Sequence, residues 1–368
     1  MNLHGLPDKN LLIVAFESDA EADVLRQLPA WRSQLRALRK NALPLIAIDA
    51  ASGVAALSDW QSDAAPPLVL LAPPLSGISR AAGLQLIFDS FGYRRYNRPL
   101  GHDNVFSNQA YVSGHGMTDL ADVEAHAETF AETVGVLAPL QPSGTIWDLH
   151  APLSPRRLLA NANTRVVHLV RDPRDVTVSA YFFFKRSTER AQGPFRASLT
   201  ERDFDAAQKE EALIQLIDGG YSALSPAGFT RHRTPRQMLD AMAATLNEPR
   251  VFTLRYELQH TDGQGQYDRL IDWLTAAAGG KAPKDRARLV TDAIDRGTFA
   301  HQTGGAMVEG VHTEAPAASP TGHLRKGIVG DWRNHFTPAV ARAFNDSVGG
   351  LLIECGFESD RDWWRNLT

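Results

Sequence analysis

The stretch RVVHLVRDPRDVTVSAYFFFK, residues 165–185, predicts how the fold is organised. Its first part, VVHLV at 166–170, is β-branched and apolar, which is typical of a buried strand. The charged turn RDPRD follows at 171–175, and Pro173 suits the first turn of a helix, where its missing N–H is not needed. A second apolar segment comes next. The stretch therefore predicts a strand, a charged turn and a helix.

The turn at Arg171 has two interpretations. It places arginines at the carboxyl end of a strand, where open α/β sheets bind their ligands. Arginine beside a helix N-terminus is suited to binding an anion. The alternative is a surface ion pair between Arg171 and either Asp172 or Asp175. Taken alone, the stretch supports both interpretations equally.

Composition narrows the class of protein. The chain has 368 residues, 43% of them hydrophobic and 22% charged, as in an ordinary soluble domain. Its net charge of −4 argues against a nucleic-acid partner, so an anion site must be a local cluster. The single cysteine, Cys355, excludes an internal disulfide framework and a cysteine-based zinc site, and no HExxH zinc helix occurs. We find no apolar run of membrane-spanning length and no signal-peptide pattern, so we expect a cytoplasmic protein without a membrane span.

Two domains are expected. Residues 1–65 predict an N-terminal αβ extension of unknown role, a structural layer or an interaction surface, with strands at 11–16 and 43–48 and helices at 20–41 and 50–60. Pro66-Pro67 marks a break, and residues 66–368 form the second domain. Its expected strands lie at 68–72, 144–150, 165–170 and 251–255. Its expected helices lie at 80–91, 119–137, 155–160, 235–247, 269–277, 285–295 and 337–355. Residues 187–227 predict loop and helix, and 303–322 a flexible loop.

Three further features bear on chemistry. The loop PLSGIS at 74–79 follows a strand and precedes a helix, which suits a phosphate-binding turn or a plain connector. The chain has no GxxxxGK[ST] motif, so a nucleoside-triphosphate P-loop is unsupported. His150 ends a strand one βαβ unit before Arg171, which predicts that both emerge at the same edge of a parallel sheet. A second basic turn, HLRKGIVGDWRN at 323–334, suits an anion or a basic surface loop.

Together these motifs resemble the sulfotransferase family that uses 3′-phosphoadenosine 5′-phosphosulfate as donor. The strongest matches are RDPRDVTVSAY at 171–181 and RKGIVGDWRNHFT at 325–337. Weaker matches occur in the family's order: PLSGIS at 74–79, LHAPL at 149–153, LRYE at 254–257 and GTF at 297–299. The resemblance covers residues 66–360 and not 1–65.

The resemblance implies a P-loop-like, three-layer α/β/α domain with a central parallel sheet. It implies that the 5′-phosphosulfate of the donor is held by Ser76, Gly77, Ile78 and Ser79. The 3′-phosphate would be bound by Arg171, Ser179, Arg325, Lys326 and Gly327. Tyr256 and Thr298 would contact the adenine, and Phe299 would stack on it. His150 matches the family's general base, and no metal is required. The co-substrates would be the donor and a small-molecule acceptor.

The phosphosulfate loop departs from the family. The family usually has lysine where this chain has Leu75, and tryptophan where it has Arg80. Either Arg80 or Lys185 replaces the lysine, or the protein binds the nucleotide and catalyses poorly, as a pseudoenzyme or regulator. A nucleoside or small-molecule kinase is a third, weaker alternative, against which the missing Walker lysine speaks. The sequence leaves open the identity of the acceptor and the oligomeric state, for which a homodimer is one alternative.

Overall fold

The structure is a computed structural model of the whole chain. It describes residues 13–16, 45–48, 65–73, 75–77, 80–95, 144–149, 154–159, 162–190, 207–219, 221–225, 228–232, 234–279, 281–305 and 326–367.

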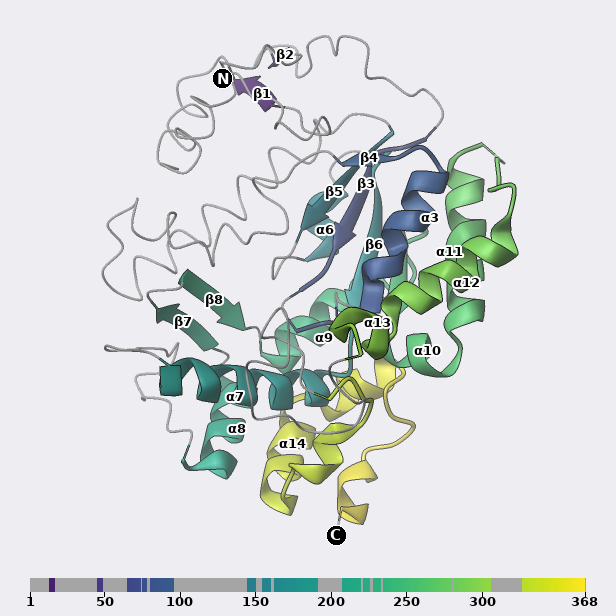
Figure 1. Cartoon of the computed structure of the whole chain (residues 1–368). Helices are drawn as coiled ribbons and strands as arrows, with labels where there is room; N and C mark the ends of the chain where they lie inside the picture. Colours follow the sequence, from purple (N-terminus) through teal and green to yellow (C-terminus); the bar gives the residue numbers. More distant parts are fainter. Residues whose placement is uncertain are drawn as a thin grey trace.

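A parallel sheet of five strands lies at the centre of the described chain (Figure 1). The strand order is β4-β5-β3-β6-β9, with β4 Arg94–Arg95, β5 Thr145–Leu149, β3 Leu68–Leu71, β6 Arg165–Val170 and β9 Val251–Arg255. Every neighbouring pair is parallel; for example, Leu71 is opposite His168, and Val170 is opposite Arg255. All five strands therefore end at one edge of the sheet.

Helices cover both faces of this sheet. On one face Leu68 and Leu70 of β3 join a core with three helices, α3 Leu84–Ser90, α11 Gly263–Ala277 and α12 Arg286–Gly297. Val69 and Leu71 alternate with them, point to the opposite face and are equally buried. The short helix α6 Pro155–Leu158 contacts β6 and α9 Pro235–Ala243. The prediction of a three-layer α/β/α domain with a central parallel sheet is confirmed.

A second core lies beyond the carboxyl edge of the sheet (Figure 1). It joins α7 Pro173–Arg190, α8 Lys209–Asp218, α9 and α14 Pro338–Glu354 with the single turns η4 Asp331–Asn334 and η5 Trp363–Asn366. The remaining described elements are β1 Ile13–Phe16, β2 Leu45–Ile48, η1 Arg80–Gly83, β7 Tyr221–Ser225, β8 Gly228–His232, α10 Tyr256–Thr261 and α13 Phe299–Thr303.

The predicted sequence of strand, charged turn and helix at 165–185 is confirmed by β6 and α7. β6 is buried on both faces from Val166 to Val170, as its apolar composition requires. α7 begins with Pro173 at its first position, and the carboxylate of Asp172 caps it by accepting the N–H of Arg174 at 2.9 Å. The turn is short, since only Arg171 and Asp172 separate the end of β6 from the start of α7.

Other predictions need correction. The helix expected within residues 187–227 is confirmed by the end of α7 and by α8, but residues 221–225 form the strand β7, which pairs with β8 in an antiparallel hairpin. The helix expected at 235–247 ends at Ala243, and its last residues form turns instead. The short helices α10 and α13 were not predicted. The predicted strands at 11–16 and 43–48 are confirmed as β1 and β2, which pair with each other in parallel. The helices predicted at 20–41, 50–60 and 119–137 lie outside the described residues.

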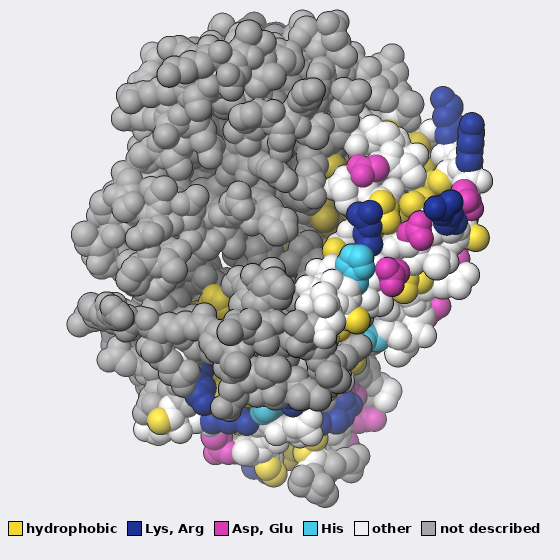
Figure 2. Space-filling model, in the orientation of Figure 1, with side chains coloured by type: hydrophobic (Ala, Val, Ile, Leu, Met, Phe, Trp, Pro, Cys, Tyr) yellow, Lys and Arg dark blue, Asp and Glu magenta, His cyan; other side chains and the backbone are white. Residues whose placement is uncertain are grey.

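The described surface over α11 and α12 carries basic and acidic side chains close together (Figure 2). Arg286 bridges Asp268 and Asp272 there, and Arg288 pairs with Asp292. Within the described residues, no helix is long and apolar enough to span a membrane.

Candidate functional site

Three neighbouring strands bring the predicted site residues to one edge of the sheet. The loop from Leu75 to Gly77 follows β3, Arg171 follows β6, and Tyr256 follows β9. β3 lies between β5 and β6, so its loop is at the point where the strand order changes direction. In open α/β sheets, ligands bind at this point, outside the carboxyl ends of the strands.

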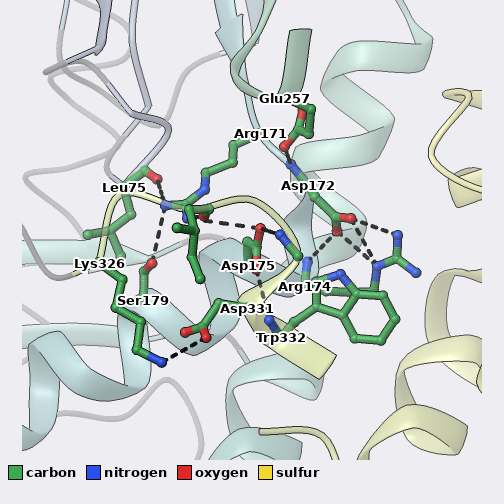
Figure 3. A network of polar contacts seen from close by, with 12 residues as sticks. Leu75, Arg171, Asp172, Arg174, Asp175, Ser179, Glu257, Lys326, Asp331 and Trp332 are labelled. Atoms are coloured by element: carbon green, nitrogen blue, oxygen red, sulfur yellow. Dashed lines mark hydrogen bonds and ion pairs between the residues drawn. The ribbon is translucent and has the colours of Figure 1, made fainter. Parts of the chain in front are cut away.

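The guanidinium of Arg171 is the centre of this edge (Figure 3). Its side chain is only 11% exposed, and Nη1 donates to the hydroxyl of Ser179 at 3.2 Å and to the carbonyl of Leu75 at 3.5 Å. Nη2 donates to the carbonyl of Ile328 at 3.5 Å. The guanidinium carbon lies 4.4 Å from the centre of the Tyr256 ring. Burial lowers the pKa of Arg171, but the surrounding acidic groups, Tyr256 and Asp175 first, leave it raised, so the group stays charged.

The loop after β3 approaches Tyr256 closely. Gly77 has φ +91°, and a Cβ there would lie 2.2 Å from the tyrosine ring, so a larger residue would collide with it. Leu75 has φ +65°, a left-handed conformation that is unusual for a non-glycine residue. Its side chain packs against the core around α7, while its carbonyl faces Arg171. The loop therefore presents a backbone carbonyl towards Arg171.

A second glycine contacts a second aromatic ring. Gly327 has φ +72°, and a Cβ there would lie 2.4 Å from the ring of Phe299, which is itself buried. The next residue, Ile328, is the one whose carbonyl meets Arg171. The segment that follows Lys326 thus packs between Phe299 and the Arg171 turn.

Lys326 is held by a buried acid. Its ammonium donates to Oδ1 of Asp331 at 3.0 Å, and the same carboxylate accepts from the side chains of Asn334 and His335. Nδ1 of His335 lies 2.7 Å from the ammonium of Lys209. An ammonium group can only donate, so Nδ1 of His335 accepts and its Nε2–H donates to Asp331. The side chain of Lys326 is thereby oriented by a hydrogen-bonded network of four others, Asp331, Asn334, His335 and Lys209.

Arg174 forms the base of the site. It is 2% exposed, pairs with Asp172 at 2.7 Å and with Glu358, and lies between the rings of Trp332 and Trp363. The guanidinium carbon is 4.1 Å from the centre of one ring and 4.7 Å from the other. Because this pair is enclosed by aromatic rings, Arg174 supports the turn rather than facing a ligand.

The buried donors near this edge that have no hydrogen-bond partner within the described part of the chain include the hydroxyl of Ser76 and Nε of Arg171. A buried donor without a partner costs free energy, and native proteins rarely leave one. An oxyanion is a group that both could satisfy. The donor set therefore fits a phosphorylated or sulfated ligand.

The model of the Sulfotransferase domain family matches residues 131–356, more than half of the chain. The chain belongs to the sulfotransferase domain family. The match contains the Arg171 turn and the segment after Lys326. It begins after the loop at 74–79, although β3, which precedes this loop, pairs with β5 and β6 of the matched region.

Curated relatives of this chain are distant. Rat sulfotransferase 2A1 is 27% identical over 188 residues, 51% of this chain and 56% of the rat protein. Cytosolic sulfotransferase 3 of Arabidopsis thaliana is 24% identical over 204 residues, 54% of this chain and 56% of the plant protein. The chain thus matches little more than half the length of these relatives.

Solved sulfotransferase structures also align with the chain. A mouse sulfotransferase, SULT7A1 complexed with PAP, aligns with 82% of this chain and 89% of its own at 17% identity and a TM-score of 0.42. A retinol dehydratase in complex with androsterone and PAP aligns with 78% of this chain and 80% of its own at 16% identity and a TM-score of 0.43.

Most of the described residues predicted for the site of this chain lie around Arg171. Direct contacts join Arg171 to Ser179 and Tyr256, Tyr256 to Gly77, and Phe299 to Gly327. Lys326 turns to Asp331 instead of contacting Arg171. The hydroxyl of Thr298 caps α13, accepting from the N–H of His301, and also donates to the carbonyl of Asp295. His150, Ile78, Ser79, Arg325 and the side chain of Arg80 lie outside the described residues.

The ion-pair alternative for the turn is partly borne out. Nη2 of Arg171 lies 4.0 Å from Oδ2 of Asp175, but both side chains are buried, so the pair is not a surface feature. Asp172 pairs with Arg174 instead. The ion pair between Arg171 and Asp175 was one of the two alternatives, but the hydrogen bonds of Asp175 to the backbone N–H groups of Gly330 and Trp332 were not predicted.

Proposed function

We propose that this chain transfers a sulfuryl group from 3′-phosphoadenosine 5′-phosphosulfate to a hydroxyl or amine of a small molecule. The observation that carries this proposal is the buried guanidinium of Arg171, surrounded by Ser179, Tyr256 and the carbonyl of Ile328. Nε of Arg171 and the hydroxyl of Ser76, which have no partner among the described residues, give an oxyanion two groups to satisfy. The donor carries such anionic groups at both ends, which matches this donor set.

In this proposal Arg171 and Ser179 hold the 3′-phosphate. Arginine suits the role because its planar fork binds two phosphate oxygens at once. Arg325, Lys326 and Gly327 approach the same phosphate from the second basic turn. Lys326 would then contribute a positive charge, and the hydrogen bond to Asp331 would orient its ammonium group. The adenine lies beside Tyr256 and Thr298 and stacks on Phe299.

The 5′ end is assigned to Ser76, Gly77, Ile78 and Ser79, with His150 as general base. A neutral imidazole near pH 7 can take the proton of the acceptor hydroxyl. A new bond forms between the acceptor oxygen and sulfur, the bond from sulfur to the phosphate oxygen breaks, and 3′-phosphoadenosine 5′-phosphate leaves. Alignment and charge stabilisation contribute most of the rate in such transfers. No metal is assigned to this reaction.

A second function, nucleotide binding with little catalysis, is motivated by Leu75. A leucine cannot stabilise charge at the phosphosulfate, and here its side chain packs against the core around α7. Lysine would adopt the left-handed backbone conformation at this position with no more strain than leucine, because the strain comes from the Cβ atom that both residues carry. Leu75→Lys therefore separates the two functions. If it creates turnover in a protein that is otherwise inert, the chain is a nucleotide-binding protein without strong catalysis.

Labelled donor tests the main proposal. A panel of alcohols and amines should include a 3α-hydroxysteroid, since one relative, from Cavia porcellus and 27% identical, is named 3-alpha-hydroxysteroid sulfotransferase. We expect a labelled sulfated product, and its loss in Arg171→Ala and His150→Ala. Unchanged turnover in both variants would overturn this mechanism. Phosphate transfer from ATP would instead indicate a kinase.

We further propose that residues 66–368 form the sulfotransferase domain and 1–65 an N-terminal extension, a division that expression of 66–368 alone would test.

A further inference from the structure

The carboxylate of Asp175 links the two basic segments of the site (Figure 3). Oδ2 accepts the N–H of Gly330 at 2.8 Å, and Oδ1 accepts the N–H of Trp332 at 3.0 Å. The side chain is 1% exposed. Gly330 has φ +76°, the left-handed conformation that directs both N–H groups to one acceptor. A two-point contact of this kind fixes the segment against α7 in one position.

This segment is the continuation of Lys326 and Gly327, and it also contacts Arg171. The carbonyl of Ile328 accepts from Nη2 of Arg171, only two residues before Gly330. Asp175 therefore sets how far Lys326 and Gly327 lie from Arg171. We propose that Asp175 is a positioning residue for the 3′-phosphate of the donor, acting through these two backbone bonds. This inference rests on the proposed donor.

Charge predicts the opposite effect of Asp175. A carboxylate 4.0 Å from the guanidinium of Arg171 weakens the attraction of that guanidinium for a phosphate. If charge dominated, Asp175→Asn would tighten phosphate binding. If positioning dominates, the same change weakens it, because the amide NH₂ of asparagine faces a backbone N–H, donor against donor, and displaces the segment. The two effects differ in sign, so one substitution distinguishes them.

The experiment compares two nucleotides by calorimetric titration of the full chain. Adenosine 3′,5′-bisphosphate carries the 3′-phosphate, and adenosine 5′-monophosphate lacks it. For Asp175→Asn we expect the preference for the bisphosphate to fall about tenfold, with the affinity for the monophosphate nearly unchanged. The matched control is Glu358→Gln, which loses a carboxylate that pairs with Arg174 and that forms no hydrogen bond or ion pair with the described 326–332 segment; it should keep the preference.

Two results would overturn the inference: tighter binding of the bisphosphate by Asp175→Asn, or an equal loss of both nucleotides, which a merely structural role would give. Should Asp175→Asn fail to fold, Gly330→Ala tests the same bonds from the other side. Alanine disfavours φ +76°, and its Cβ would meet only the end of the Arg333 side chain, 2.8 Å away. We expect the same selective loss. A wild-type chain that does not prefer the bisphosphate would instead contradict the proposed donor.

Discussion

The guanidinium of Arg171 and the hydroxyl of Ser179 lie 3.2 Å apart, although the two residues are eight positions apart in the chain. Arg171 lies in the turn before α7 and Ser179 in the second turn of that helix, so the long side chain of the arginine spans the distance between them. In the proposed site this pair holds one phosphate between a charged fork and a hydroxyl.

Ser179→Ala should weaken the binding of adenosine 3′,5′-bisphosphate about tenfold or more, the effect of one hydrogen bond to a charged group. The affinity for adenosine 5′-monophosphate should not change. Titration of both nucleotides measures this difference. Ser90→Ala is the control, since this serine lies at the end of α3 and its hydroxyl donates to the carbonyl of Ile87. An unchanged bisphosphate affinity in Ser179→Ala would remove this serine from the site.

Gly77→Ala should both destabilise the fold and displace Tyr256. Alanine in a left-handed conformation costs about 1–2 kcal/mol, and its Cβ would also meet the tyrosine ring at 2.2 Å. Gly92→Ala is a matched control, because Gly92 has φ +76° and open space around its Cβ position. Both variants should lose stability in thermal unfolding. Only Gly77→Ala should also lose nucleotide affinity; equal behaviour of the two would show that the contact with Tyr256 is unimportant.

Arg174→Met should be strongly destabilising. It leaves the buried carboxylate of Asp172 without its arginine, and breaking a buried pair in this way costs about 3–5 kcal/mol. Chemical denaturation followed by tryptophan fluorescence measures the loss, since Trp332 and Trp363 enclose the guanidinium. Arg288→Gln, which removes an exposed pair with Asp292, should leave the midpoint unchanged. A small effect of Arg174→Met would mean that the two tryptophans support the turn without the charge.

Loss of the proton from Glu257 should lower the free energy of unfolding as pH rises. Its Oε1 accepts the N–H of Asp172, its Oε2 has no partner among the described residues, and burial raises the pKa of the carboxyl above its ordinary value of 4.5. The folded state therefore binds the proton more tightly than the unfolded state does. The stabilisation by this proton is complete below the ordinary pKa and is lost as pH rises through the raised pKa.

Glu257→Gln isolates this effect, because Asp175 has a pKa raised by burial as well and changes stability in the same direction. We expect the free energy of unfolding of the wild type, relative to Glu257→Gln, to be lower at about pH 8 than at about pH 5. Urea unfolding of both proteins at the two pH values gives this difference. A difference that is constant with pH would show that Glu257 titrates alike in both states.

The parallel sheet and the Arg171 turn could be predicted because local signals agree there. β6 contains four β-branched or apolar residues, Val166, Val167, Leu169 and Val170, and Asp172 and Pro173 form a helix start that can be recognised in the sequence. The β7–β8 hairpin was missed because YSALS and GFTRH are short and lack a clear alternation of apolar and polar residues. α10 was missed because Tyr256 follows β9 directly, with no loop between them.

The residues of the candidate site could be predicted from the sequence, but their hydrogen-bond partners could not. The arginines, the glycines and Ser179 could be identified from their motifs. The sequence could not indicate that Lys326 would turn to Asp331, or that Asp175 would bind two backbone N–H groups from a distant segment. Such bonds depend on how α7 packs against η4, and packing between distant segments leaves no local pattern.

The position of Arg174 between Trp332 and Trp363 has a consequence for the order of folding. Arg174 and its partner Glu358 are 184 residues apart in the sequence, so the ribosome makes the arginine long before its partners. Contacts of such long range are formed slowly, because a large loop must close before they can stabilise anything. A nascent chain that has just completed β6 and α7 therefore carries an incomplete turn, in which Arg174 still lacks both of its tryptophans and Glu358. The arrangement of the turn described here is complete only after the last helices have been synthesised.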